Sequence, residues 1–203
     1  MARSPELFER IRAAANQSPR DFVNHYLFSV PPYAFRAFPS EYQDFRAELA
    51  ARLDVVVDDI TLVGSGRLGF SLNPEHLLRT FGARSDLDVV IVSSEVFDST
   101  WTELLEKSTE IALAAEEERR RFKKTKENFF RGYLRPDHLP LTIGLASEWF
   151  PKLASRFASP VASSHEVQGW LFKSELHART LYAEHLNRVQ ADILRILQLE
   201  EKK

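Results

Sequence analysis

The chain has 203 residues, of which 44% are hydrophobic and 28% are charged, and its net charge is −2. These values are typical of an ordinary globular protein with one good core, and they give no general sign of nucleic-acid binding, although local basic patches remain open. The sequence contains no cysteine, which excludes disulfides, thiolate zinc sites and cysteine nucleophiles. No apolar run reaches membrane-spanning length and the start is charged, so we expect a cytoplasmic protein that makes no use of a membrane.

The N-terminal part of the chain predicts helices that pack against a sheet. Ser4-Pro5 and Ser18-Pro19 each place a capping hydroxyl before a proline, which is typical of a helix start. Pro31 should end the second helix, because proline cannot continue one. Residues 40–43 spell a capping box for a third helix that leads into the first strand. Nothing in these helices suggests chemistry.

The stretch 60–94 predicts a strand, a glycine-serine turn, an excursion and a second strand. The turn lies at Gly64 to Gly66, and the second strand opens on Asp86, Leu87 and Asp88. Since side chains alternate along a strand, both carboxylates should lie on one face while Leu87 enters the core. Two such carboxylates are suitable ligands for a hard divalent cation, and the turn can offer backbone N–H groups to a phosphate.

This combination resembles the nucleotidyltransferase superfamily, which includes DNA polymerase beta, poly(A) polymerases and CCA-adding enzymes. Its signature is a Gly-Ser turn, another glycine a few residues on, and Asp-x-Asp on the next strand. The residues that match are Gly64, Ser65, Gly69, Asp86 and Asp88, and the resemblance covers about the central fifth of the chain. It implies an α/β fold with a small mixed sheet, in which the two motif strands are adjacent and helices flank them.

The resemblance also implies an activity, namely transfer of a nucleoside monophosphate from an NTP to an acceptor with the help of Mg²⁺ or Mn²⁺. Asp86 and Asp88 would bind the metal. The residues expected to bind the nucleotide phosphates from the turn are Gly64, Ser65, Gly66, Arg67 and Gly69. The acceptor is left open between a nucleic-acid end, a nucleotide, a protein side chain and a small molecule.

Active members usually carry a third carboxylate on a later strand, beside the first pair. Glu166 is our candidate for this catalytic acid, because it lies in the next strand-like segment, and Glu148 and Asp137 are weaker candidates. If none of them fits, either two acids suffice or the site binds nucleotide without turnover.

A long helical insertion is expected over about residues 99–130, beginning at a cap at Ser99. Its last part carries six positive charges within eight positions, which are either a solvated helix face or a phosphate-contacting patch. The loop that follows interleaves aromatic residues and arginines. There Arg131 and Arg135 could hold a triphosphate while Tyr133 stacks on a base, or all three could be structural.

From Val161 the chain again looks strand-like, and a last strand with a long C-terminal helix is expected over about residues 165–200. That helix could pack on the same unit or pair two subunits in a homodimer. With no linker in view, we expect a single nucleotidyltransferase-like domain over residues 1–203.

Two other hypotheses compete with the enzyme. One is a catalytically silent nucleotide-binding or interaction module on the same fold, for instance in a defence or toxin-antitoxin system. In the other, Asp86 and Asp88 merely start an edge strand and the glycine turn is an ordinary one.

Overall fold

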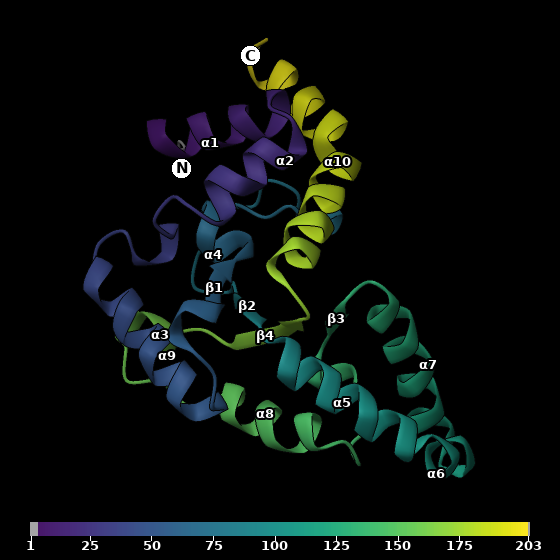
Figure 1. Cartoon of the computed structure of the whole chain (residues 1–203). Coiled ribbons are helices and arrows are strands. Elements are labelled where there is room, and N and C mark those ends of the chain that lie inside the picture. The colour runs from purple at the N-terminus through teal and green to yellow at the C-terminus, as the bar shows by residue number, and fades with distance from the viewer. Residues whose placement is uncertain (1–3, 203) are drawn as a thin grey trace.

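A mixed β-sheet lies at the centre of the protein, with helices on both of its faces (Figure 1). The computed structural model describes residues 4–202, and within them the sheet has four strands in the order β1-β2-β4-β3. The strands are β1 (Ile60–Val63), β2 (Leu87–Val92), β3 (Tyr133–Leu134) and β4 (Val167–Phe172). β2 is antiparallel to β1 and parallel to β4, and β3 is antiparallel to β4. The chain is therefore an α/β protein, and its two motif strands are adjacent as expected.

The helices precede, connect and follow these strands. They are α1 (Pro5–Asn16), α2 (Pro19–Phe22), α3 (Pro39–Leu53), α4 (Gly64–Leu68), α5 (Ser94–Glu106), α6 (Ser108–Leu113), α7 (Glu116–Phe130), α8 (Gly144–Ala154), α9 (Pro160–Ser163) and α10 (Glu175–Glu200). Short helical turns lie at η1 (Val23–Leu27), η2 (Tyr33–Phe35), η3 (Val57–Asp59), η4 (Pro74–His76) and η5 (Pro136–His138). No helix in residues 4–202 combines the length and apolarity needed to cross a membrane.

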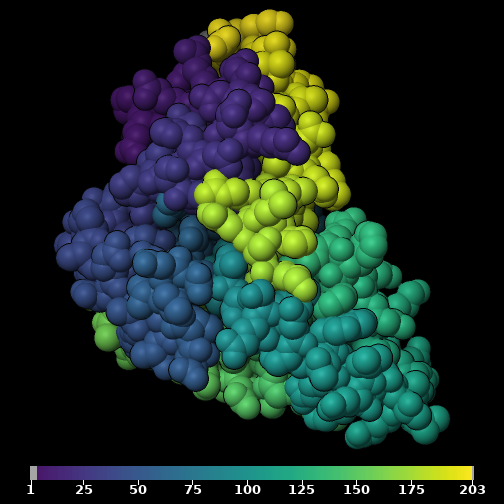
Figure 2. Space-filling view, viewed as in Figure 1, coloured from purple at the N-terminus to yellow at the C-terminus, as the bar shows by residue number. Residues whose placement is uncertain are grey.

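The first and last helices pack together on one face of the sheet. α1, α2 and α10 contact one another and form one end of the molecule, coloured purple and yellow in Figure 2. The side chains of Leu7, Ile11, Leu186 and Ile193 are fully buried, or nearly so, in this layer. The apolar side of α10 is thus used within the chain, against α1.

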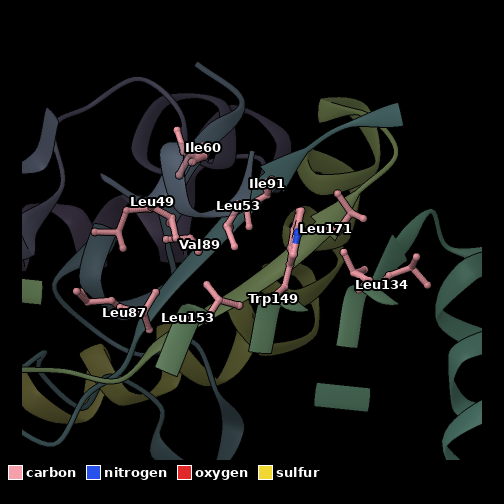
Figure 3. Close-up of a cluster of buried hydrophobic side chains, with 14 of the residues drawn as sticks. Leu49, Leu53, Ile60, Leu87, Val89, Ile91, Leu134, Trp149, Leu153 and Leu171 are labelled. Carbon is pink, nitrogen blue, oxygen red and sulfur yellow. The ribbon is translucent and has the colours of Figure 1, made fainter. Parts of the chain in front are cut away.

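The opposite face of the sheet carries α3, α5 and α8. From β2, Leu87, Val89 and Ile91 point into this core, where Figure 3 shows them beside Trp149 and Leu153 of α8. All three β2 side chains have no exposed surface. This core is built mainly from apolar side chains, so it fixes which way β2 turns its side chains.

Several element boundaries differ from the sequence-based expectation. The helical insertion is confirmed, but it is broken into α5, α6 and α7, and its cap is Ser93, whose hydroxyl accepts a hydrogen bond from the Val96 N–H. Ser99 lies inside α5. Val161 belongs to helix α9 and not to a strand, because Ser159 caps this helix and Pro160 takes its first position.

Candidate functional site

Asp86 and Asp88 lie at the start of β2, on the face opposite the apolar core. Asp86 immediately precedes the strand, Asp88 is its second residue, and the buried Leu87 separates them. Both carboxylates line a cavity of about 680 Å³ bounded by the turn after β1, the segment 71–88, β4 and α10. β2 has neighbours on both sides, so the acids do not start an edge strand.

The glycine turn contacts the acidic pair directly. Val63, the last residue of β1, is paired with Asp88, so Gly64 lies beside the carboxylate. Gly64 has φ +61°, and a Cβ atom placed on it would be 2.5 Å from Asp88 Oδ2. Only glycine fits this position, because of both the positive φ and the close approach of the carboxylate. Ser65 follows at the start of α4, lines the same cavity, and its hydroxyl makes no hydrogen bond within the described chain.

The strand beside the acids presents an amide where a third carboxylate was expected. Gln168 of β4 is in register with Asp88, and its Nε2 donates a hydrogen bond to Asp86 Oδ2 at 3.3 Å. Glu166 lies two residues earlier, ahead of the strand, where its side chain is exposed and lines a separate cavity of about 630 Å³. The Glu166 backbone oxygen accepts a hydrogen bond from the Leu87 N–H, but Glu166 does not line the cavity that holds the acidic pair. Asp137 and Glu148 do not line the acidic cavity either.

Burial and neighbouring negative charge raise the pKa values of two groups in the cavity, Asp88 and Tyr182. Burial, followed by the nearby charge of Asp86, raises the pKa of Asp88 from 3.8 to about 6, although the charge of Arg135 opposes this. Burial and the charge of Asp88 likewise raise the pKa of Tyr182, an α10 residue that lines the cavity. Neither Asp86 nor Asp88 forms an ion pair within residues 4–202, so the Arg135 charge acts on Asp88 without a salt bridge.

Three residues of the motif serve packing and do not line the cavity. A Cβ atom on Gly69, which has φ +89°, would lie 2.8 Å from Leu7 and Tyr33, and a Cβ atom on Gly66 would lie 3.1 Å from Leu87. The Arg67 side chain is buried, which lowers its pKa, and its backbone oxygen accepts a hydrogen bond from Arg10. Only Gly64 and Ser65 of the turn thus face the acids.

The aromatic-arginine loop reaches the site through Trp170. Arg135 binds Asp137 with two hydrogen bonds, of 3.0 and 2.7 Å, and its guanidinium lies 4.5 Å from the Trp170 ring. Tyr133 also stacks on Trp170, with 5.4 Å between the centres of the two rings. Trp170 lines the cavity, and its indole N–H is buried without a partner in the described chain. Arg131 is exposed and does not line the cavity.

Further residues of the cavity wall were missing from the sequence-based prediction. Besides Gln168, they include three basic side chains, Arg79 and Arg84 from the segment between the motif strands and Arg188 from α10. Composition gives no signal for them, because arginines on irregular segments and helix surfaces are common. Only the fold shows that they surround the same cavity as the acids.

The donor set is suited to a divalent cation only in part. Two free carboxylates on one face are appropriate ligands for Mg²⁺, which usually completes its shell with water and substrate phosphates. Within residues 4–202 no group of three or more histidine, cysteine or acidic side chains could hold a metal ion. A cation here would therefore depend on its substrate for further ligands.

No family model, curated protein or solved structure matches this chain. The functional assignment consequently depends on the geometry of the cavity.

Proposed function

We propose that the chain binds a nucleoside triphosphate together with Mg²⁺ in the cavity next to Asp86 and Asp88, and transfers its nucleoside monophosphate to an acceptor. One observation carries this proposal: the carboxylate of Asp88 touches the Gly64 turn, with Asp86 on the same side of the sheet. A cation and a phosphate group bound there would be neighbours. Such a neighbourhood is what a metal-chelated polyphosphate requires.

Each side chain has a distinct role in this proposal. Asp86 and Asp88 bind the cation, while the free hydroxyl of Ser65 donates to a phosphate oxygen, and Gly64 leaves room for that oxygen to approach. Bound Mg²⁺ supplies neutralisation of the charge that develops on the leaving pyrophosphate. The hydrogen bond from Gln168 keeps the Asp86 carboxylate oriented. A cytoplasmic location belongs to the proposal, because nucleoside triphosphates are available there.

A second candidate function, nucleotide binding without turnover, is favoured by Gln168. An amide is neutral and does not accept a proton, so it cannot activate an acceptor hydroxyl as a carboxylate would. Gln168 lies beside both acids, in the position where the resemblance calls for the third one. A silent module and an enzyme would share the same metal and nucleotide contacts and would differ only in product formation.

The test combines binding and turnover. Calorimetry with each NTP and Mg²⁺ should show metal-dependent binding, and Asp86→Ala and Asp88→Ala should each weaken it about 100-fold, since each removes a charged ligand. Asp44→Ala is the matched control, because Asp44 is an exposed acid of α3 away from the cavity. Wild-type binding in both aspartate variants would refute the proposal.

Product analysis then separates the two candidates. Labelled NTPs are incubated with RNA, DNA, nucleotides and the protein itself as acceptors, and pyrophosphate release is followed. Product that disappears in Asp86→Ala and Asp88→Ala supports nucleotidyl transfer. Metal-dependent binding without any product supports the silent module.

A further inference from the structure

Charged side chains of both signs line the cavity but do not neutralise one another. Asp86 and Asp88 form no ion pair within the described chain, and the side chains of Arg79 and Arg84 make neither a hydrogen bond nor an ion pair there. Arg188 forms one long ion pair, 3.9 Å from Glu184, and its side chain is 60% exposed. Opposite charges that share a cavity and remain unpaired are available for a ligand that itself carries both signs.

The arginines of the segment between the motif strands are placed by ordered backbone. Phe70 and Thr80 form an isolated antiparallel bridge, and the Ser71 N–H donates to the Arg79 oxygen at 2.9 Å. Leu78, next to Arg79, is buried and adopts φ +59°, a conformation that non-glycine residues rarely take. Residues 69–81 therefore form a folded hairpin that holds Arg79 over the cavity.

Arg84 is placed by a separate tight turn. The Ser85 N–H donates to the Gly82 oxygen at 2.8 Å, and the Ser85 hydroxyl accepts from the Gly82 N–H at 3.2 Å. Ser85 is buried immediately before the acidic pair, so the turn fixes Arg84 two residues from Asp86. Arg188 approaches the same cavity from α10.

We propose that Arg79, Arg84 and Arg188 form a clamp that selects a chain of phosphates over a single phosphate. This inference rests on the proposed function, whose substrate it specifies as the polyphosphate tail of the NTP. Guanidinium groups bind phosphate oxygens in bidentate fashion, and these three come from different segments around the cavity, so an anion with several phosphates should engage them together better than a single phosphate does. The two acids require that this anion arrive with a cation, which a metal-chelated triphosphate does.

A nucleic-acid strand suits these residues less well than a polyphosphate. The basic run of α7 does not line the cavity, and much of it is engaged elsewhere: Arg119 binds the Ala114 oxygen and Arg121 pairs with Glu117. The cavity itself contains the two free carboxylates, which repel a phosphate backbone that brings no bound cation.

The experiment measures binding of inorganic triphosphate and of inorganic monophosphate by calorimetry, with and without Mg²⁺. The wild type should bind triphosphate at least about tenfold more tightly than monophosphate, and Arg79→Ala, Arg84→Ala and Arg188→Ala should each weaken triphosphate binding about five- to tenfold. Arg120→Ala, which removes an exposed arginine of α7 outside the cavity, should change triphosphate binding less than about twofold. Equal affinity for the two anions, or clamp variants that bind triphosphate like the wild type, would overturn the proposal.

The same titrations separate failure of the clamp from failure of the proposed function. Asp86→Ala and Asp88→Ala should abolish the enhancement by Mg²⁺ but retain metal-free triphosphate binding, which depends on the arginines. If Mg²⁺ has no effect on the wild type while the arginine variants lose binding, the clamp is supported and the metal site is refuted. If Mg²⁺ enhances binding and the arginine variants are normal, the clamp is refuted. The arginine variants alter exposed side chains, and unchanged melting temperatures will confirm that they fold.

Discussion

Successive residues of strand β2 point to opposite faces of the sheet, and the two faces have different roles. Leu87 and Val89 are fully buried in the hydrophobic core formed with α3 and α8. Asp88, between them, turns to the other face and lines the polar cavity with Asp86. The comparison shows how one face of a strand can anchor it while the other face holds unpaired charge. Partial burial of the Asp88 carboxylate destabilises the folded state, and the burial of apolar side chains on the opposite face offsets this loss.

Removing the anchor should have the largest effect on stability. Leu87→Ala deletes a fully buried side chain and should lower the free energy of unfolding by about 2–5 kcal/mol. Urea denaturation followed by circular dichroism measures this change. The folded fraction should keep its affinity for Mg²⁺-triphosphate, because the site lies on the other face. A loss below about 1 kcal/mol would show that Leu87 does not anchor the strand.

Disturbing the contact between the turn and the acid should affect both stability and binding. Gly64→Ala places a Cβ atom 2.5 Å from Asp88 Oδ2 at a positive φ, so we expect a destabilisation of about 1–3 kcal/mol and weaker metal-dependent binding. Gly82→Ala is the matched control, because a Cβ atom there meets nothing within 4 Å. If both variants unfold and bind like the wild type, the Gly64–Asp88 contact is not close in solution.

Neutralising Asp88 should stabilise the protein and abolish metal binding. Its pKa is raised from 3.8 to about 6 in the folded protein, so the folded state binds more protons than the unfolded state between these pH values. Stability therefore falls as the pH rises from about 4 to about 6 and stays lower above that range. Asp88→Asn cannot ionise, and we expect it to be more stable than the wild type by about 1–2 kcal/mol at pH 8.

The difference between Asp88→Asn and the wild type should vanish below pH 4, where the carboxyl is protonated in both the folded and unfolded states. Thermal melts at pH 3.5, 5, 6 and 8 provide the measurement. A variant that is equally or less stable than the wild type at pH 8 would show that the Asp88 carboxylate is not penalised by its surroundings.

The sequence was informative about the site wherever the signal was local. The alternation of Asp86, Leu87 and Asp88 follows from strand geometry, and the glycine turn directly follows a strand, so both could be placed without coordinates. The α/β class was implied by the resemblance of these motifs, and the helical insertion followed from periodicity, although the breaks at Lys107 and Ala114 that divide the insertion carry no strong signal.

Which residues lie beside the acids depends on long-range pairing, which the sequence does not show. Glu166 and Gln168 lie in one strand-like segment, and only the register of β4 against β2 shows that Gln168, and not Glu166, lies opposite Asp88. Similarly, Arg188 approaches the acids only because α10 packs back over the sheet. These placements depend on tertiary contacts between distant segments, which propensity and spacing do not encode.

The parallel pairing of β2 with β4 has a consequence for how the protein is made. Helices α5 to α9 lie between these two strands in the sequence, so joining them closes a long loop, which is a slow and entropically costly step. The β1–β2 hairpin can form early and already unites Gly64 with Asp88. A nascent chain on the ribosome would thus possess the acids and the turn well before β4 and α10 emerge to enclose them.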